Sequence, residues 1–287
     1  MNLPFYIVDV FTEKKYAGNQ LAVFLDANSL STQQMQQVAR EINFAESTFV
    51  TKLDGHNSTA TIRIFTPEHE MQFAGHPIIG TSWVLMHKVL KNQPDKITVS
   101  VPIGEIAVRQ VGDLVWLQAA QPQFLDVFSK EDFTIFSNLS STDFNDNFPI
   151  QEVTTGSAFV IVPVKTKNAL QNLILDKEKT NEWLKNHCKT NHRALYFYCI
   201  EDEKLSSRML CIENNQLIED AATGSASTCL QAFLLKYYAT EIQMINHQGD
   251  FINRPSQIYF DGKLTNNDFD INIGGKSQFI AKGDWEV

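Results

Sequence analysis

Hydrophobic and polar residues alternate along much of this chain, and alternation with a period of two predicts β-strands. The strands expected in the first half lie at 5–11, 21–25, 47–53, 60–64, 97–101, 106–110 and 114–117. The strands expected in the second half lie at 157–164, 194–201, 207–213, 243–246, 257–260, 270–273 and 277–282. Residues 121–149, rich in Asp, Ser, Asn and Phe, have no assignable pattern and form a candidate connection between the halves.

Helical spacing is confined to a few stretches. Ser31 and Gln34 form a capping box, and apolar residues then recur at i, i+3, i+4 and i+7 from Met35, which predicts an amphipathic helix. Pro77 suits the first position of a second helix, expected over 78–90. The other expected helices lie at 176–186 and from 224 to about 238.

This order of elements predicts the fold class. Runs of strands interrupted by few helices favour an α+β fold with mostly antiparallel sheets, and they disfavour a parallel, doubly wound sheet. The cycle of strands, long helix and strands occurs twice, which indicates a weak repeat of about half the chain length. We therefore expect domains at 1–120 and 121–274, with the last strand, about 275–287, as a further candidate member of the first.

Two glycine turns open the long helices expected in the two halves. The first is FAGHP at 73–77 and the second is DAATGS at 220–225, and acidic residues precede each of them. The unpaired N–H groups and the positive dipole end of a helix N-terminus favour anions. Two such ends facing each other would bind a small carboxylate or a developing oxyanion, which points to proton transfer on a small acid.

Charge and composition restrict the kinds of partner that the chain is expected to bind. The chain has 24 basic and 33 acidic residues and a net charge of −9, which disfavours nucleic-acid and anionic-membrane binding. No run approaches the ~20 apolar residues of a membrane span, and the first residues lack the apolar core of a signal peptide. We expect a cytoplasmic protein that acts on a small anionic cyclic acid or amino acid.

Cysteine and histidine spacing gives no sign of a metal site. His69 and His76 have no second pair that would complete a zinc site. Dinucleotide- and phosphate-binding glycine motifs are absent from the sequence, so we expect no metal and no organic cofactor. No CxxC spacing occurs, and we expect reduced, semi-buried thiols at Cys188, Cys199, Cys211 and Cys229.

Two candidate acid–base residues lie in the first half. Glu46 comes where a helix gives way to a strand, and apolar neighbours would desolvate its carboxyl, which could then give and take a proton near neutral pH. The plainer interpretation is a charge at a helix end that faces water. His76 follows Gly75 at a helix start and could hydrogen-bond a substrate or shuttle a proton, although the favoured interpretation of this residue alone is an exposed polar residue in a turn.

Two further candidates flank the second glycine turn. Ser225 could donate its hydroxyl and its backbone N–H to a carboxylate, and Asp220 could orient an amino group or a proton relay. A residue of either type before a helix is commonly a simple cap, and from the spacing alone the cap is the favoured interpretation.

Taken together, these segments resemble the PhzF-like family of phenazine-biosynthesis isomerases. The resemblance runs over essentially the whole chain in the family's order, and the combined pattern is specific where single pieces are not. The matching segments are DVF at 9–11, GN at 18–19, NFAESTFV at 43–50, RIFTP at 63–67, FAGHP at 73–77, EDAATGSA at 219–226, HQG at 247–249 and RPS at 254–256.

The resemblance implies two pseudo-symmetric domains similar to diaminopimelate epimerase, each a barrel-like sheet around a central helix, with the active site in the cleft between them. It implies a homodimeric isomerase, similar to dihydro-3-hydroxyanthranilate isomerase, that needs no cofactor. By motif position Glu46 would move a proton from one carbon to another, with His76 and Asp220 as catalytic partners. The substrate-binding residues implied are Asn19, Gly75, Thr223, Gly224 and Ser225.

Departures from the family pattern leave the substrate open. Gln20 and Ala221 stand where proline is usual, and Ile78-Ile79 replaces the commoner Thr-Leu. Two other functions are considered. An amino-acid racemase or epimerase would place cysteines at the two glycine turns, where this chain has His76 and Ser225. A non-catalytic ligand-binding or interaction protein on the same fold would not require the acid–base residues.

Overall fold

The computed structural model describes residues 2–188 and 194–287, and the chain divides into two compact units. Unit 1 contains Met1–Gln118 and Ile273–Val287, and unit 2 contains Ala119–Asn272. Strand β17 (Asp268–Gly275) runs from the second unit into the first.

Unit 1 is built mainly from strands. These are β1 (Asn2–Val10), β2 (Asn19–Phe24), β3 (Glu46–Asp54), β4 (Thr59–Phe65), β5 (Glu70–Met71), β6 (Lys96–Val101), β7 (Gly104–Val111), β8 (Leu114–Gln118) and β18 (Ser277–Glu286). Its helices are η1 (Ala27–Ser29), α1 (Thr32–Ile42), α2 (Gly75–Val84) and the π-helical turn η2 (Leu85–Val89).

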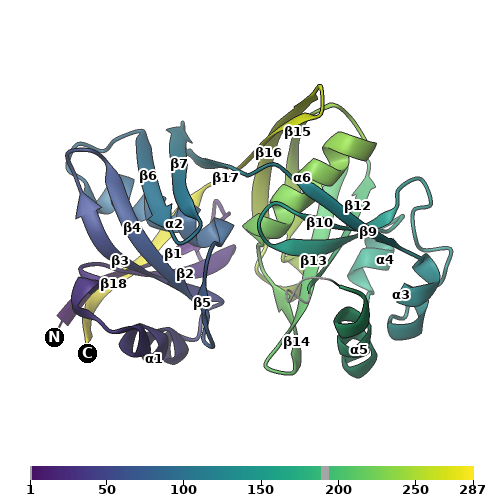
Figure 1. Cartoon of the computed structure of the whole chain (residues 1–287), viewed down its shortest axis with the longest axis horizontal. Coiled ribbons are helices and arrows are strands. Elements are labelled where there is room, and N and C mark those ends of the chain that lie inside the picture. The colour runs from purple at the N-terminus through teal and green to yellow at the C-terminus, as the bar shows by residue number, and fades with distance from the viewer. Residues whose placement is uncertain (1, 189–193) are drawn as a thin grey trace. The chain divides into compact units, whose positions relative to one another are not determined.

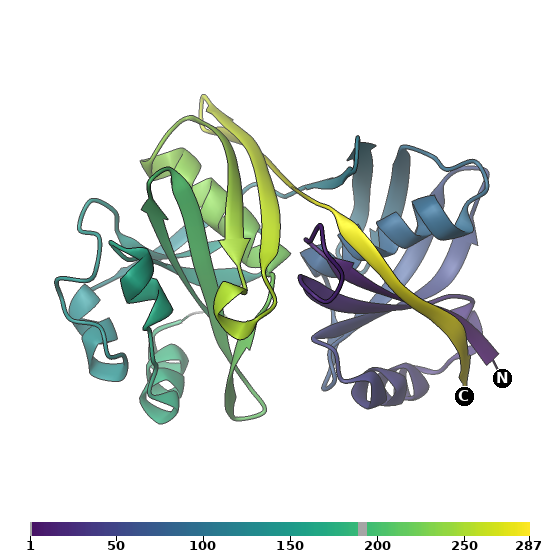
Figure 2. The ribbon, with the colours of Figure 1, turned by 180° about the vertical axis from the view of Figure 1, so that it is seen from behind.

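The strands of unit 1 surround helix α2. β1 pairs antiparallel with β18 and β2, although β1 and β18 come from opposite ends of the chain (Figures 1 and 2). β2 pairs parallel with β3 after the α1 crossover, and β4 pairs parallel with β6 after α2. β6, β7 and β8 form a meander, and β8 pairs with β17, which leads into β18. Helix α2 packs against β1, β2, β3, β6 and β8, and nearly all of its residues are buried, as expected of a central helix.

Unit 2 has the same kinds of element. Its strands are β9 (Gln123–Phe128), β10 (Ile150–Thr154), β11 (Ala158–Pro163), β12 (Ala194–Glu201), β13 (Lys204–Glu213), β14 (Gln216–Asp220), β15 (Glu241–Gln248), β16 (Ser256–Thr265) and most of β17. Its helices are α3 (Lys130–Phe136), α4 (Lys167–Gln171), α5 (Lys177–His187), α6 (Gly224–Tyr237) and η3 (Asp250–Ile252).

Pairing in unit 2 repeats that of unit 1. β10 pairs antiparallel with β9 and β11, as β1 does with β18 and β2. β11 pairs parallel with β12 after α4 and α5, and β13 pairs parallel with β15 after α6. Helix α6 packs against β10, β11, β15 and β16. The structure therefore contains the repeat that the sequence suggested, and the mixed α+β class with a central helix in each half is confirmed.

Residues 121–149, taken as a connection, contribute to the core of unit 2. They form β9 and α3, and their Phe133, Phe136 and Phe144 pack in one cluster with Trp183 of α5. The Phe133 and Trp183 ring centroids lie 4.9 Å apart. The sequence prediction failed here because α3 is short and its aromatic residues do not follow a clear strand or helix period.

Several expected elements need correction. Pro77 occupies the third helical position of α2, not the first, which is tolerated because the first N–H groups of a helix have no intrahelical partner. The helix expected over 78–90 changes to π geometry at Leu85. Elements β10, α4 and β14 were not expected, whereas the capping box at Ser31 and the helix from Gly224 are confirmed.

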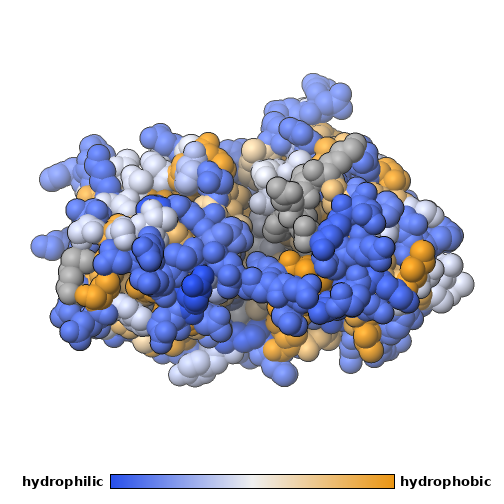
Figure 3. Space-filling view, turned by 60° about the horizontal axis from the view of Figure 1, so that its bottom comes forward, coloured by the Kyte–Doolittle hydropathy of each residue, from blue (hydrophilic) through white to orange (hydrophobic). Residues whose placement is uncertain are grey.

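The surface is mostly hydrophilic on the face in Figure 3, where hydrophobic residues form small separate groups. Within 2–188 and 194–287, none of the helices combines the length and apolar character that a bilayer crossing would need.

Candidate active site

In unit 1 the crossover through α1 brings two candidate residues to neighbouring strands. Asn19 begins β2 and Glu46 begins β3, and the parallel register places Leu21 beside Glu46. Helix α1 ends at Ile42, and the left-handed backbone of its C-cap, Asn43 (φ 55°), turns the chain toward β3. Adjacent parallel strands begin at the same end of the sheet, so Asn19 and Glu46 lie at that end.

Helix α2 brings the third residue to the same place. Its N-cap, Ala74, offers no side-chain hydrogen bond, and the first helical bond runs from the Ile78 N–H to the Ala74 carbonyl. The N–H groups of Gly75 and His76 thus lie in an uncapped first turn, the arrangement that favours a negative charge. Both residues are buried.

The His76 side chain contacts both of the other side chains in this group. Its Nε2 lies 3.5 Å from Oε2 of Glu46, and its Nδ1 lies 3.4 Å from the Asn19 amide nitrogen. The His76 side chain is 3% exposed and that of Glu46 is 16% exposed. Burial lowers the pKa of His76 to about 3, against which a hydrogen bond to the Gln20 backbone acts only weakly. His76 is therefore neutral at neutral pH.

A neutral His76 can carry its ring proton on either of its two nitrogens. If Nδ1 accepts a hydrogen bond from Asn19, the ring proton sits on Nε2 and faces a carboxylate. If Nδ1 instead carries the ring proton, the Nε2 lone pair faces the Glu46 carboxyl group. The tautomer of His76 therefore decides whether Nε2 presents a donor or an acceptor to Oε2 of Glu46.

Close packing holds these elements together. The hydroxyls of Thr48 on β3 and Thr81 on α2 form a buried hydrogen bond of 2.8 Å. At Gly80 an added Cβ would lie 2.6 Å from methyl groups of Val10 and Leu21, so the glycine allows α2 to approach β1 and β2 closely. At Gly18 (φ 70°) a Cβ would lie 2.3 Å from the Val10 carbonyl oxygen, so this turn before Asn19 requires glycine.

In unit 2 the second glycine turn is built on hydrogen bonds from its own residues. The Thr223 hydroxyl donates to Oδ2 of Asp220 at 2.5 Å. The Gln248 amide on β15 donates to the Asp220 carbonyl at 2.9 Å and contacts the Thr223 hydroxyl at 3.0 Å, while its Oε1 accepts from the Thr223 N–H at 3.2 Å. Gln248 thus bonds to both Asp220 and Thr223.

Gln248 is itself held by a buried tyrosine. The Tyr196 hydroxyl donates to Gln248 Oε1 at 2.8 Å and accepts from Ser207 and Asn246. Burial raises the pKa of Tyr196 to about 12, so its hydroxyl remains a donor at neutral pH. The sequence analysis missed both residues, although Gln248 lies in the HQG motif.

Asp220 and Ser225 are not helix caps. The N-cap of α6 is Thr223. Its side chain makes no cap hydrogen bond, because its hydroxyl donates to the Asp220 side chain instead. Gly224 begins the helix and Ser225 follows in its first turn, half-buried. The second turn therefore presents a carboxylate, a serine and an uncapped helix start within one short segment.

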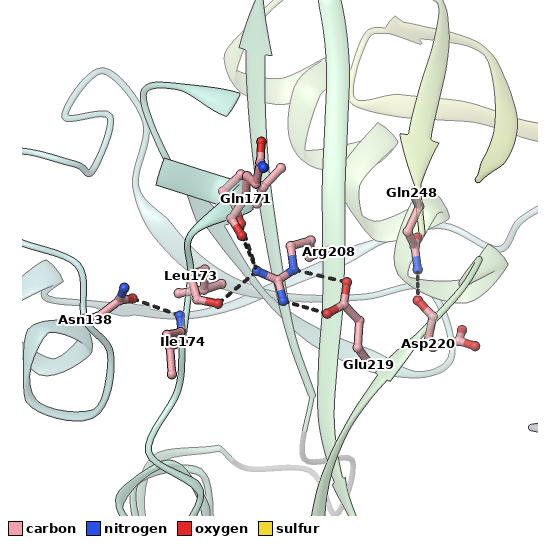
Figure 4. Close-up of polar contacts among 9 residues, drawn as sticks. Asn138, Gln171, Leu173, Ile174, Arg208, Glu219, Asp220 and Gln248 are labelled. Atoms are coloured by element: carbon pink, nitrogen blue, oxygen red, sulfur yellow. Dashed lines mark hydrogen bonds and ion pairs between the residues drawn. The ribbon is translucent and has the colours of Figure 1, made fainter. Parts of the chain in front are cut away.

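An arginine–glutamate pair secures the strand that leads to each turn. In unit 1, Arg63 of β4 forms two hydrogen bonds to Glu70 of β5, at 2.7 and 2.6 Å. In unit 2, Arg208 of β13 bonds Glu219 of β14 at 3.0 and 2.6 Å and also the Leu173 carbonyl at 2.9 Å (Figure 4). Each glutamate belongs to the acidic approach noted in the sequence, and the arginines occupy equivalent places in the repeat.

The structure thus gathers the candidates in two groups, each within its own unit. Asn19, Glu46, Gly75 and His76 form the first, and Asp220, Thr223, Gly224 and Ser225 form the second. Among the described residues there is no cluster of three His, Cys, Asp or Glu side chains able to hold a metal ion.

The cysteines are free thiols, three of them buried rather than semi-buried. Cys229 donates to the Ser157 carbonyl at 3.4 Å, and burial raises its pKa to about 12.

Comparison with known proteins adds the family. The sequence pattern described as phenazine biosynthesis-like protein (PhzC–PhzF) matches residues 8–283. The chain belongs to this family. A relative in Pseudomonas aeruginosa, named trans-2,3-dihydro-3-hydroxyanthranilate isomerase, is 32% identical over 265 residues, which cover 89% of this chain and 88% of the relative. A Pasteurella multocida protein named as an isomerase is 29% identical over 292 residues, which cover 98% of this chain and 96% of that protein.

Solved structures agree with this assignment. The crystal structure of a PhzF-family phenazine biosynthesis protein from Bacillus anthracis has a TM-score of 0.88, with 26% identity and complete coverage of both chains. A probable proline racemase from Agrobacterium radiobacter shares the fold, with a TM-score of 0.65 and 10% identity. The match covers 99% of this chain and 93% of the racemase chain. The protein is a PhzF-family isomerase and a distant homologue of dihydro-3-hydroxyanthranilate isomerase.

Proposed function

We propose that this protein is a cofactor-independent isomerase that moves a proton between two carbons of a small carboxylic or amino acid, with Glu46 as the general acid and base. The Glu46 carboxylate takes a proton from one carbon, the double bond shifts, and the carboxyl returns a proton to the other carbon. The formula of the substrate is unchanged, and Glu46 ends in its starting form.

The contact between Glu46 and His76 is the observation that carries this proposal. A general base must reach its proton within hydrogen-bond distance and be able to return it. Because His76 remains neutral, it can support either form of the carboxyl by exchanging the roles of its two nitrogens. A permanently charged partner would instead hold Glu46 in one form, and turnover needs both.

We assign substrate binding to the groups around the two turns. Asn19 and Gly75 serve this role in the first group, and Thr223, Gly224 and Ser225 serve it in the second. Asp220 acts as a catalytic partner that orients an amino group or relays a proton. The family resemblance implies that the two groups act on one substrate molecule. It also implies that the enzyme is a homodimer, and both points are part of this proposal.

A two-thiol racemase mechanism is disfavoured by the environment of Cys229. Its thiol is buried and donates to a carbonyl, and the burial that raises its pKa opposes formation of a thiolate, the form that accepts a proton. His76 stands where the first thiol of such a mechanism would be expected.

The proposal is tested by incubating the protein with trans-2,3-dihydro-3-hydroxyanthranilate and a panel of small cyclic acids, and following isomerised product by NMR. We expect wild type to convert one member of the panel and Ser225→Ala to convert it with a raised KM. Conversion that survives in a Glu46→Gln, His76→Gln double variant would overturn the proposal. Binding of a panel member without conversion would favour the non-catalytic binding protein.

A further inference from the structure

Unit 1 contains a cavity of about 590 Å³ that is separate from the group around Glu46. Its walls come from the end of helix α2 with the following π-helical turn and from the start of β18, with contributions from the segment after β1. His87, which lines it, lies about three helical turns beyond His76. Neither His76, Glu46 nor Asn19 is among the lining residues.

Aromatic rings and a lysine form one side of this cavity. The Lys88 ammonium lies 5.4 Å from the ring centroid of Trp83 and 5.1 Å from that of Phe279. Trp83 also packs on His87, with ring centroids 4.9 Å apart. The π-helical turn at Leu85–Val89 sets His87 and Lys88 on the helix at this point, and single π turns within helices often occur at functional sites.

A buried hydroxyl forms another part of the wall. Ser277 is 5% exposed, and within the described residues its Oγ has no hydrogen-bond partner. Ser277 and Phe279 are two residues apart on β18, so their side chains lie on the same face of the strand. A buried hydroxyl without a partner is destabilising, and a ligand that accepts its hydrogen bond would remove this penalty.

The cavity is positively charged although the whole chain is acidic. Lys276 is held by Glu13 at 2.7 Å and lies 3.9 Å from Asp113. Lys15 and Lys88 also line the cavity, so its lysines outnumber its carboxylates in a chain whose net charge is −9. Burial lowers the pKa of His87, which leaves the ring neutral at neutral pH and able to donate or accept a hydrogen bond.

We propose that this cavity binds a small planar aromatic carboxylate at a second ligand site, distinct from the proposed catalytic site. The carboxylate pairs with the Lys88 ammonium and accepts from the Ser277 hydroxyl, and the ring packs against Trp83 and Phe279. Inorganic phosphate is a poorer match, because the rings of Trp83 and Phe279 lie beside the Lys88 ammonium and their faces offer phosphate no donor. The volume is of the size that such ligands occupy.

Benzoate is the probe for this site, and the Trp83 indole N–H signal in a ¹⁵N-resolved NMR spectrum is the readout, assigned with Trp83→Phe. The test variant is Lys88→Met. The matched control is Lys236→Met, because Lys236 lies over two rings in unit 2, with its ammonium 3.8 Å from the centroid of Phe124, and does not line this cavity. The readout does not involve activity, so it is independent of the proposed function.

We expect benzoate to shift the Trp83 signal saturably in wild type, in Lys236→Met and in Glu46→Gln. In Lys88→Met the dissociation constant should rise at least about tenfold, or about 1.4 kcal/mol. Absence of a shift in wild type, or an equal dissociation constant in the two lysine variants, would overturn the proposal. An equal response to inorganic phosphate would show a general anion site and overturn the assigned ligand class.

Discussion

Nε2 of His76 lies 3.5 Å from Oε2 of Glu46, and the two residues reach this contact from different elements, the start of α2 and the start of β3. They are 30 positions apart in sequence, and the close approach of α2 to β1 and β2 through Gly80 brings the helix near the strand start. The contact joins a neutral buried imidazole to a carboxyl group, and the proposed chemistry depends on it.

The buried His76 makes stability depend on pH. Its pKa is about 3 in the folded protein against 6.5 for the free side chain, so between these values the unfolded chain binds the extra proton. Above about pH 6.5 the titration of His76 does not change the free energy of unfolding. As pH falls from 6.5 toward 3, the titration lowers this free energy by at most about 1.4 kcal/mol per pH unit. Urea unfolding of wild type and His76→Gln from pH 4 to pH 8 measures this contribution.

We expect the free energy of unfolding of wild type to fall more steeply below pH 6.5 than that of His76→Gln. Other groups titrate in both proteins, so the difference between the two curves isolates His76. Parallel curves across the whole range would contradict a neutral, buried His76.

The two arginine–glutamate pairs should differ in their effect on stability. Arg208 and Glu219 are each 10% exposed, and Arg208 also donates to the Leu173 carbonyl, whereas Arg63 and Glu70 are 27% and 26% exposed. Removing one partner of a buried pair leaves a buried charge uncompensated. We expect Arg208→Leu to lower the free energy of unfolding by about 3 kcal/mol and Arg63→Leu by about 1 kcal/mol. Equal losses in urea unfolding would show that burial does not distinguish the pairs.

Gln248 should affect catalysis through the second glycine turn. Gln248→Leu removes the bonds to Asp220 and Thr223 and the bond that the Tyr196 hydroxyl donates to Gln248. We expect kcat/KM to fall about tenfold or more, with partial recovery in Gln248→Glu, whose carboxylate still accepts from Tyr196 and the Thr223 N–H. The control is Gln243→Leu, an exposed position on the same strand. If both leucine variants had wild-type kcat/KM, Gln248 would have no positioning role.

Particular elements show how far the sequence could lead. Ser31 with Gln34 predicted the start of α1, and Gly224 predicted the start of α6, because caps and glycine turns are local signals. Strand β14 was missed because its residues, QLIED, do not alternate between apolar and polar, and helix α4 was missed because its five residues make less than two helical turns. The Arg208–Glu219 pair was missed because it is made across a hairpin, and only the repeat relating it to Arg63 could have indicated it.

The site residues illustrate the same limit. Glu46 and His76 could be named from their motifs, but their contact depends on the β2–β3 register and on the packing of α2, which are long-range features. Tyr196 carries no local signal, because a tyrosine in an apolar strand is ordinarily a core residue.

Deuterium exchange tests the central claim most directly. Once a substrate is identified, wild type, Glu46→Gln and the exposed control Glu41→Gln are incubated with it in D₂O, and incorporation at carbon is followed by NMR. We expect wild type and Glu41→Gln to incorporate deuterium at equal rates and Glu46→Gln to be slower by at least about 10²-fold, with substrate affinity within about tenfold of wild type. Incorporation by Glu46→Gln at the wild-type rate would contradict the assignment of Glu46 as the acid–base residue.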